Sequence, residues 1–380
     1  MQSGDTTSGS RLDPAQWARV ATLARHLTET GRIPALTAQL TTGDDLLPPI
    51  GSGSLRGDVG ASRPLPEHAI FLTASLSKPL VAMGVLLLVE RGELALTDRV
   101  CDIIPEFAAA PKRPITVRHL LTHTSGLPDM LPNNLELRRR QAPLSAYVAG
   151  ACEVSLDFPC GRGVQYQSMG YALLGEVIGR VTGRPVADYL RDELFHPCGM
   201  HETWLGLPAD RLDDRSGIAE RVAWVRVPAE QAAGDDWNWN SRYWRTLGAP
   251  WGGVFSTAHD LCLFLRLMLR RGRIGRESLF NPDTIAAAVG NQLELCHDVP
   301  EADRRTRGWG LGWRLNWPAH PATFGDTLPP HVCGHWGATG TLWWFDPLRN
   351  IGCVLLTTQP LERHNTDHLR LSNAIVASLR

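Results

Sequence analysis

Residues 71–78 read Phe71-Leu72-Thr73-Ala74-Ser75-Leu76-Ser77-Lys78 and lead directly into an apolar segment, Pro79 to Glu90. We interpret this stretch as a strand followed by a buried helix that carries a serine and a lysine on its first turn. Residues three apart lie on the same side of a helix, so the spacing places the Ser75 hydroxyl beside the Lys78 amine. We expect the rest of the fold to be organised around this helix.

The pairing of Ser75 with Lys78 has a chemical interpretation. A hydroxyl that attacks a carbonyl at neutral pH needs a base within hydrogen-bond reach. Burial would lower the pKa of Lys78 and free its amine, whereas arginine stays protonated and cannot act as a base. Of the 38 lysines and arginines, lysine stands only at Lys78 and Lys112. Ser-x-x-Lys also occurs by chance, with the serine capping a helix and the lysine reaching towards solvent.

Composition limits the classes of partner. The formal net charge of −1 provides no basic field that would attract nucleic acid or an anionic membrane. The polar N-terminal segment, residues 1–13, lacks the pattern of a secretory signal, and we expect it to be poorly ordered and the protein to be cytoplasmic. The apolar run at 79–89 is too short to span a bilayer.

The eight cysteines form no close pairs, which indicates free thiols. The oligomeric state stays open.

The order of predicted elements indicates an α+β fold. We expect helices and strands in the segments 14–31 (helix), 35–42 and 69–73 (strands), 115–126, 170–183, 185–195 and 259–271 (helices), 309–315, 340–345 and 351–358 (strands), and 366–379 (helix). This order predicts a mixed, mainly antiparallel sheet flanked by helices and built from both termini, residues 14–90 and 250–380. Residues 91–249 would form an inserted, mostly helical domain with an aromatic-rich loop.

Two further groups of residues have alternative interpretations. Trp237, Trp239 and Trp244 lie among polar residues in a loop-like segment, where tryptophans either line a substrate cleft or cover the core between two domains. His119 and His123 are four residues apart, which is a metal-ligand spacing. Because no acidic third ligand lies nearby, we expect them to pack or to form hydrogen bonds. We expect neither a metal nor a cofactor.

Two later motifs give the chain a family resemblance. Tyr166-Gln167-Ser168 precedes a predicted helix, and His335-Trp336-Gly337-Ala338 precedes a predicted strand. In this order, after Ser-x-x-Lys, the chain resembles the serine β-lactamase and penicillin-binding protein superfamily, in particular class C β-lactamases and family VIII carboxylesterases. The resemblance extends over roughly residues 15–378. It includes the stretches 119–127, 170–175, 252–257 and 334–341.

The resemblance implies roles for individual residues. Ser75 would be the acylated nucleophile, and Lys78 and Tyr166 would share the proton transfers, with the residue that takes the serine proton left open. The backbone N–H groups of Ser75 and Ala338 would form the oxyanion hole. The resemblance also implies substrate-binding positions at Ser168, His335, Trp336 and Gly337.

Two departures from the family pattern bear on the substrate. His335 stands where relatives usually have a lysine, and an imidazole is a weaker cation for holding a substrate carboxylate. Ser168 stands where class C β-lactamases usually have asparagine, so an amide that grips a substrate amide is missing. We therefore expect a carboxylesterase for small neutral esters. The alternatives are a β-lactamase or D-amino-acid-specific peptidase and, in another class, a penicillin-binding acyl trap or sensor without turnover.

Overall fold

The largest sheet is assembled from both ends of the chain. The structure, a computed structural model, describes residues 12–57, 65–213, 217–317, 323–362 and 365–380, so the expectation for residues 1–13 lies almost wholly outside the described residues. Six antiparallel strands follow the order β2-β1-β11-β10-β9-β8. Their bounds are β1 (Ala35–Thr42), β2 (Ile50–Gly53), β8 (Arg314–Leu315), β9 (Cys333–Gly337), β10 (Thr341–Asp346) and β11 (Ile351–Thr357). The expected mixed, mainly antiparallel α+β fold is confirmed.

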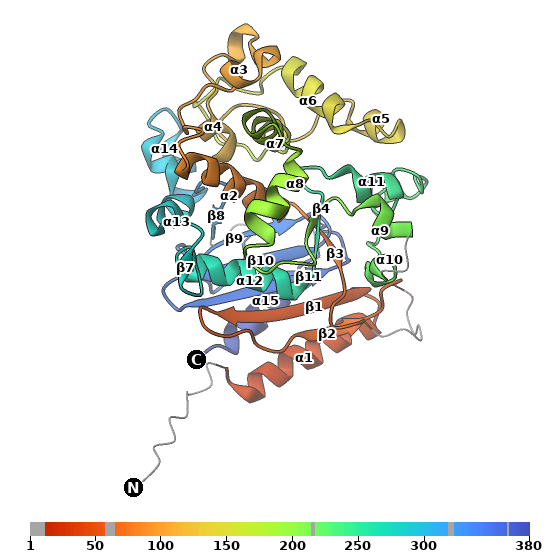
Figure 1. Ribbon diagram of the computed structural model, residues 1–380. Helices are drawn as coiled ribbons and strands as arrows, with labels where there is room; N and C mark the ends of the chain where they lie inside the picture. The colour runs from red at the N-terminus through yellow and green to blue at the C-terminus, as the bar shows by residue number, and fades with distance from the viewer. Residues whose placement is uncertain (1–11, 58–64, 214–216, 318–322, 363–364) are drawn as a thin grey trace.

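Both faces of this sheet are covered. Alternate residues of a strand point to opposite faces, and in β11 Val354 and Leu356 join one hydrophobic core while Cys353 and Leu355 join the other. Helices α1 (Pro14–Glu29) and α15 (Asp367–Ala377) lie below the sheet in Figure 1, and α12 (Ala258–Leu269) lies above it. The α1 helix begins at the predicted cap, where the Asp13 carboxylate accepts hydrogen bonds from two backbone N–H groups.

A second, smaller sheet leads into the serine-bearing helix. Its strands are β3 (Phe71–Ala74), β4 (Trp204–Leu205) and β5 (Val254–Ser256), in the order β3-β5-β4. The helix that follows β3 is α2 (Ser77–Glu90), and its residues from Ser77 to Leu88 are all buried. A helix that is apolar on all sides belongs in the core, as the sequence predicted. Ser75 lies in the turn just before this helix.

Apart from β4, the regular elements between α2 and β5 are helices, and in Figure 1 most of them lie above the sheet, with α9 (Ala209–Asp213) and α10 (Ile218–Arg221) at its right. The other α-helices are α3 (Val100–Ile103), α4 (Val117–Leu121), α5 (Asn134–Arg139), α6 (Leu144–Glu153), α7 (Met169–Thr182), α8 (Val186–Leu190) and α11 (Arg242–Leu247). Later in the chain come the β6–β7 hairpin (Arg273–Ile274 and Glu277–Ser278), α13 (Pro282–Val289) and α14 (Glu301–Thr306). We propose that domain boundaries lie at residues 90/91 and 249/250.

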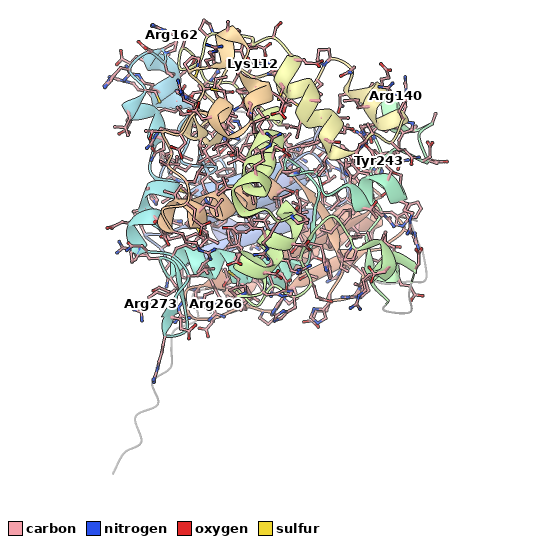
Figure 2. All side chains as sticks on the ribbon, turned by 45° about the horizontal axis from the view of Figure 1, so that its top comes forward. Lys112, Arg140, Arg162, Tyr243, Arg266 and Arg273 are labelled. Carbon is pink, nitrogen blue, oxygen red and sulfur yellow. The ribbon has the colours of Figure 1, made fainter. Side chains whose placement is uncertain are left out.

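The second lysine has a structural role. Lys112 is buried in the helical part of the molecule (Figure 2). Its ammonium group donates to the carbonyl oxygens of Ala151 and Cys152 at the end of α6. A cation at this position satisfies carbonyl groups that have no partner within the helix. Lys112 therefore stabilises a helix end.

Three predicted elements differ from the structure. The helix expected at 115–126 ends at Leu121, because His123 has a backbone φ of 60°, which a right-handed helix cannot contain. The strand expected at 309–315 is reduced to Arg314–Leu315, since Gly312 turns the chain with a φ of 84°. Beyond Leu190, the helix expected at 185–195 widens into a single π-helical turn.

The cysteines, all of which lie in the described part of the chain, form no disulfide bonds. All eight cysteines are free, and five of them are buried. Among the helices in the described ranges, none is both long and apolar enough to cross a membrane.

Candidate active site

The Ser75 hydroxyl lies at the junction between β3 and α2. It is partly exposed, whereas the other residues between Phe71 and Leu80 are buried. The preceding residue, Ala74, has a φ of 48°, a strained conformation for a residue with a Cβ atom. The Ser77 hydroxyl fixes this turn, because it donates to the Ala74 carbonyl at 2.6 Å and accepts from the Val254 N–H at 2.9 Å. The turn therefore presents one hydroxyl to solvent from a rigid base.

The Lys78 amine contacts the Ser75 hydroxyl directly. Lys78 Nζ donates to Ser75 Oγ at 3.1 Å and to the Trp251 carbonyl oxygen at 2.9 Å. The side chain is completely buried, and burial lowers the pKa of Lys78 to about 7, although the nearby Asp129 carboxylate acts in the opposite direction. At neutral pH a large fraction of Lys78 is therefore an amine that can accept the proton of Ser75.

Two threonines bind the serine-bearing strand to the main sheet. Thr339 Oγ1 donates to the Leu72 carbonyl oxygen at 2.8 Å, and Thr341 Oγ1 donates to the Thr73 carbonyl oxygen at 2.7 Å. Both threonines and both partners are buried, so these hydrogen bonds are shielded from competing water. They hold the turn after β9 against the end of β3.

Gly337 allows the end of β9 to lie very close to the serine. A Cβ atom at Gly337 would lie 2.4 Å from the Thr73 carbonyl oxygen and 3.2 Å from the Ala74 Cβ atom, so only glycine fits there. Ala338, the next residue, is exposed. Ala338 follows Gly337 and Ser75 follows Ala74, so this close contact is compatible with an oxyanion hole made from the N–H groups of Ser75 and Ala338, which stays a prediction.

Tyr166 lies beside Lys78. The Lys78 ammonium is 4.5 Å from the centre of the Tyr166 ring. Burial and the Asp129 carboxylate raise the pKa of Tyr166 well above its ordinary value. The nearby Ser75 hydroxyl lowers the pKa of Tyr166. The Tyr166 hydroxyl nevertheless forms no hydrogen bond with any of the described residues. Tyr166 is therefore a neutral phenol at physiological pH rather than a phenolate.

His335 and Trp336, on β9, form a wall of the candidate site beside the Tyr166 ring. His335 is buried, and its Nδ1 donates to the Trp336 carbonyl oxygen at 2.7 Å, which leaves Nε2 as a lone-pair nitrogen without a partner in the described residues. Burial and the Lys78 and Arg314 cations hold the pKa of His335 well below its ordinary value. The Trp336 ring lies 5.4 Å from the Tyr166 ring. This wall is uncharged and aromatic.

Comparisons with known proteins identify the family of this chain. A family model described as β-lactamase matches residues 20–376. The chain belongs to the β-lactamase family. It is 31% identical to Penicillin-binding protein 4 of Amycolatopsis lactamdurans, over 80% of this chain and 74% of that protein, and 31% identical to Esterase EstB of Burkholderia gladioli, over 85% of this chain and 84% of that protein.

The solved structures show the same fold. A penicillin-binding protein homologue from Caulobacter crescentus superimposes with a TM-score of 0.76 at 24% sequence identity, over 97% of this chain and 99% of that chain. Together with the family match, these findings make the protein a hydrolase with the serine β-lactamase fold.

Asp129 lies at the candidate site although the sequence did not indicate it. Its carboxylate accepts a hydrogen bond from Ser168 Oγ at 2.6 Å, and its backbone carbonyl accepts from the N–H groups of Ser168 and Met169. The side chain is exposed and close enough to act on Lys78 and Tyr166. Ser168, expected to bind substrate, therefore uses its proton on Asp129. A lone aspartate in a loop has no distinguishing sequence pattern.

Arg314 is a second such residue. Its side chain is completely buried, and its three guanidinium nitrogens have no hydrogen-bond partner in the described residues. The guanidinium carbon lies 3.7 Å from the Trp317 ring centre and 4.2 Å from that of Trp336. Tyr166 is close enough to interact with it electrostatically. In sequence Arg314 is one of many arginines, so no local signal could have singled it out.

The three tryptophans predicted in the aromatic-rich segment lie in the core region. Trp237 and Trp244 are buried, and their rings lie 5.4 Å and 4.4 Å from the guanidinium carbon of Arg138. Trp239 is partly buried against the larger core. These contacts favour the interpretation in which the tryptophans cover the core. In the same region Trp251, whose carbonyl accepts from Lys78, contacts the site more directly.

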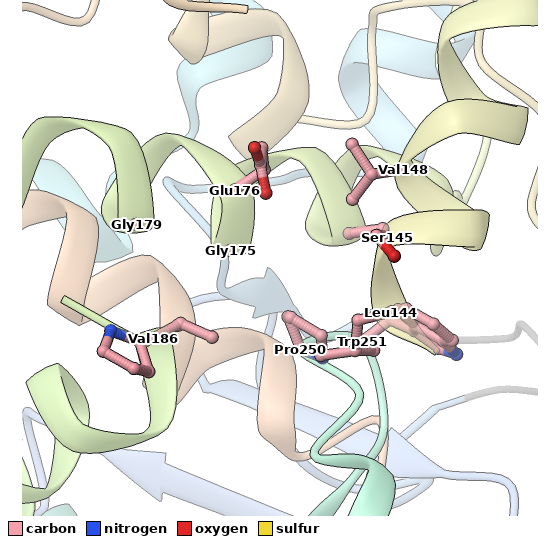
Figure 3. A pocket seen from close by; sticks show the side chains of 11 residues that line it. Leu144, Ser145, Val148, Gly175, Glu176, Gly179, Val186, Pro250 and Trp251 are labelled. Atoms are coloured by element: carbon pink, nitrogen blue, oxygen red, sulfur yellow. The ribbon is translucent and has the colours of Figure 1, made fainter. Parts of the chain in front are cut away.

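A cavity of about 160 Å³ is lined in part by Trp251. In Figure 3, Pro250 and Trp251 lie along its lower edge, and Val148 and Glu176 lie along its upper edge. The residues expected to be catalytic do not line it, so it neighbours the candidate active site without belonging to it. Within the described ranges, no group of three or more His, Cys, Asp or Glu residues could hold a metal ion. Of the two spaced histidines, His119 accepts from the Thr116 N–H.

Proposed function

We propose that the protein is a carboxylesterase that hydrolyses small neutral esters through an acyl-enzyme on Ser75. The observation that carries this proposal is the 3.1 Å contact between Ser75 Oγ and a buried Lys78 amine whose pKa is about 7. This contact supplies the activated nucleophile that acyl transfer needs. The similarity to Esterase EstB supports the choice of ester as the substrate class.

The reaction would proceed in two steps. Ser75 Oγ attacks the ester carbonyl carbon while its proton passes to the Lys78 amine, and the N–H groups of Ser75 and Ala338 bind the oxyanion. The tetrahedral intermediate then expels the alcohol, which takes a proton through Tyr166. In the second step, water attacks the acyl-enzyme, the acid leaves, and Ser75 regains its proton. The neutral phenol of Tyr166 suits it as the group that delivers protons.

The charges around the site support neutral substrates. His335 is kept uncharged by burial and by neighbouring cations, so it offers no fixed positive charge to a substrate carboxylate. The exposed Asp129 carboxylate would repel an anion that approaches the site. Arg314 is buried behind Trp317 and Trp336, where a substrate atom cannot reach it. The Asp129 carboxylate thus disfavours anionic substrates, and neither His335 nor Arg314 offers them an accessible cation.

The alternatives make different predictions. The similarity to Penicillin-binding protein 4 favours a β-lactamase or D-amino-acid-specific peptidase, whose substrates carry a carboxylate. An acyl trap without turnover would be labelled once at Ser75 and would then stop. A stopped-flow comparison of p-nitrophenyl butyrate with a chromogenic cephalosporin separates these possibilities.

We expect steady ester turnover and little cephalosporin hydrolysis, both abolished in Ser75→Ala. Ser145→Ala is a matched control, because Ser145 is exposed on α6 and lies outside the site. In His335→Lys we expect cephalosporin hydrolysis to rise relative to ester hydrolysis. Ester turnover that survives in Ser75→Ala contradicts the mechanism, efficient cephalosporin turnover by the wild type contradicts the substrate class, and a single burst indicates the acyl trap.

A further inference from the structure

His123 holds the chain on both sides of Tyr166. Its carbonyl oxygen accepts a hydrogen bond from the Gln165 N–H at 3.0 Å, and its Nδ1 accepts from the Gln167 N–H at 3.1 Å. One residue thus binds the backbone immediately before and immediately after the tyrosine. The His123 ring also contacts the Tyr166 ring, with 5.0 Å between ring centres.

The conformation of His123 is unusual in a way that this double contact explains. The residue is completely buried and has a φ of 60°, which costs a residue with a Cβ atom about 1 kcal/mol or more. In a regular helix its carbonyl would point along the helix axis. The left-handed conformation turns the chain away from the path of α4. Both the carbonyl and the ring of His123 can then reach the segment 165–167. Backbone strain at this position is thus offset by contacts to the residues that flank Tyr166.

The hydrogen bonds determine which nitrogen of His123 carries the proton. A backbone N–H can only donate, so Nδ1 must be the lone-pair nitrogen and the proton lies on Nε2. Protonation of Nδ1 would place two donors against each other and break the contact with Gln167. Burial and the positive charge of Lys78 hold the pKa of His123 well below its ordinary value, so the acceptor persists across the working pH range.

We infer that His123 is the positioning residue for Tyr166, which it holds at the Ser75–Lys78 pair through its Nδ1 and carbonyl acceptors. This inference rests on the proposed function, because it assumes that Tyr166 passes protons there. The Tyr166 hydroxyl has no hydrogen-bond partner in the described residues, so the position of the ring depends on the backbone of Tyr166 and on ring packing. A displacement of about 1 Å in a reacting group can lower a rate about 100-fold.

Two amide variants test the role of Nδ1. Asparagine places an oxygen acceptor at the Nδ1 position and tolerates positive φ, whereas glutamine moves the amide one carbon further, so that a carbon atom, which cannot accept a hydrogen bond, lies at that position. For p-nitrophenyl butyrate, we expect His123→Gln to lower kcat/KM about 10- to 100-fold, mainly through kcat. We expect His123→Asn to retain most of the wild-type rate. If the glutamine variant does not fold, His123→Phe keeps the ring and removes the acceptor.

The same variants in a Tyr166→Phe background show whether His123 acts through Tyr166. There we expect His123→Gln to change kcat/KM less than about threefold, because effects on one functional unit are not additive. An equal loss in both backgrounds, or an asparagine variant as slow as the glutamine variant, overturns the inference. A Tyr166→Phe enzyme as fast as wild type also overturns it. Ser75→Ala reports separately on the proposed function, since that variant fails to lose activity only if Ser75 is not the nucleophile.

Discussion

The protonation of Lys78 predicts how the rate of acylation depends on pH. With its ordinary pKa of 10.5, Lys78 would be a neutral amine in about one molecule in three thousand at pH 7. With a pKa of about 7, roughly half of the molecules carry the neutral amine. Burial therefore increases the fraction of enzyme with a competent base by about three orders of magnitude. The rate of acylation should therefore rise with pH, because the Lys78 amine accepts the Ser75 proton only when it is unprotonated.

The measurement is kcat/KM for p-nitrophenyl butyrate between pH 5 and pH 10 at constant ionic strength, with Ser75→Ala subtracted as the spontaneous background. The pH dependence of kcat/KM reports groups of the free enzyme. We expect the rate to rise tenfold per pH unit below about pH 7 and to become level above it. Lys78→Arg should abolish the activity at every pH, since a guanidinium does not deprotonate.

A different titrating group would give a different profile. Burial raises the pKa of Tyr166 well above its ordinary value, so a Tyr166 phenolate acting as the base would make the rate rise up to pH 10 and beyond. In Tyr166→Phe we expect a lower rate, with the rising limb of the pH profile still ending near pH 7. A limb that lies above pH 9 in the wild type, or that disappears in Tyr166→Phe, would refute the assignment of Lys78 as the base.

Two charged neighbours give further predictions. In Asp129→Asn the pKa of Lys78 falls below about 7, because the carboxylate that raises it is gone, and the limb of the pH profile moves to lower pH. Asp102→Asn is the control, because Asp102 lies on α3 and its carboxylate pairs with Arg99, and it should leave the profile unchanged. An unchanged profile in Asp129→Asn would contradict the electrostatic argument. Arg314→Met removes a buried cation without a hydrogen-bond partner and should raise the free energy of unfolding by roughly 1–2 kcal/mol in urea titrations. A loss of stability would show that the contacts with the two tryptophans outweigh the cost of burying the charge.

The helices with local start and stop signals could be predicted from the sequence. Asp13 followed by Pro14 marks the beginning of α1, and Gly183 closes α7 with a φ of 66°. The helix expected at 115–126 failed because its end depends on His123, whose left-handed conformation is supported by contacts with residues 165–167. No periodicity in the sequence carries information about such a distant partner.

The candidate site divides in the same way. The Ser75–Lys78 pair follows from a three-residue spacing, so it could be predicted before any tertiary contact was known. The second acceptor of Lys78 is the carbonyl of Trp251, 173 residues further along the chain, and every residue type offers a carbonyl. The missing lysine at His335 was visible in the sequence. The buried Arg314 on the neighbouring strand was not, because its significance lies in its burial and lack of partners.

Asp129 and Arg314, which the sequence could not indicate, contribute to the pKa values of the groups at the candidate site. Asp129 favours the protonated form of Lys78, whereas burial favours the neutral amine, and together they leave the pKa of Lys78 close to physiological pH. At Tyr166, Asp129 raises the pKa and Arg314 lowers it, while burial remains the largest effect. The proposed mechanism needs an amine that can accept a proton and a phenol that can donate one. These opposing effects on the two pKa values are suited to both needs. In the proposed mechanism, the charges that tune the site therefore come from a loop and a neighbouring strand, whereas the recognisable motifs would supply the reacting atoms.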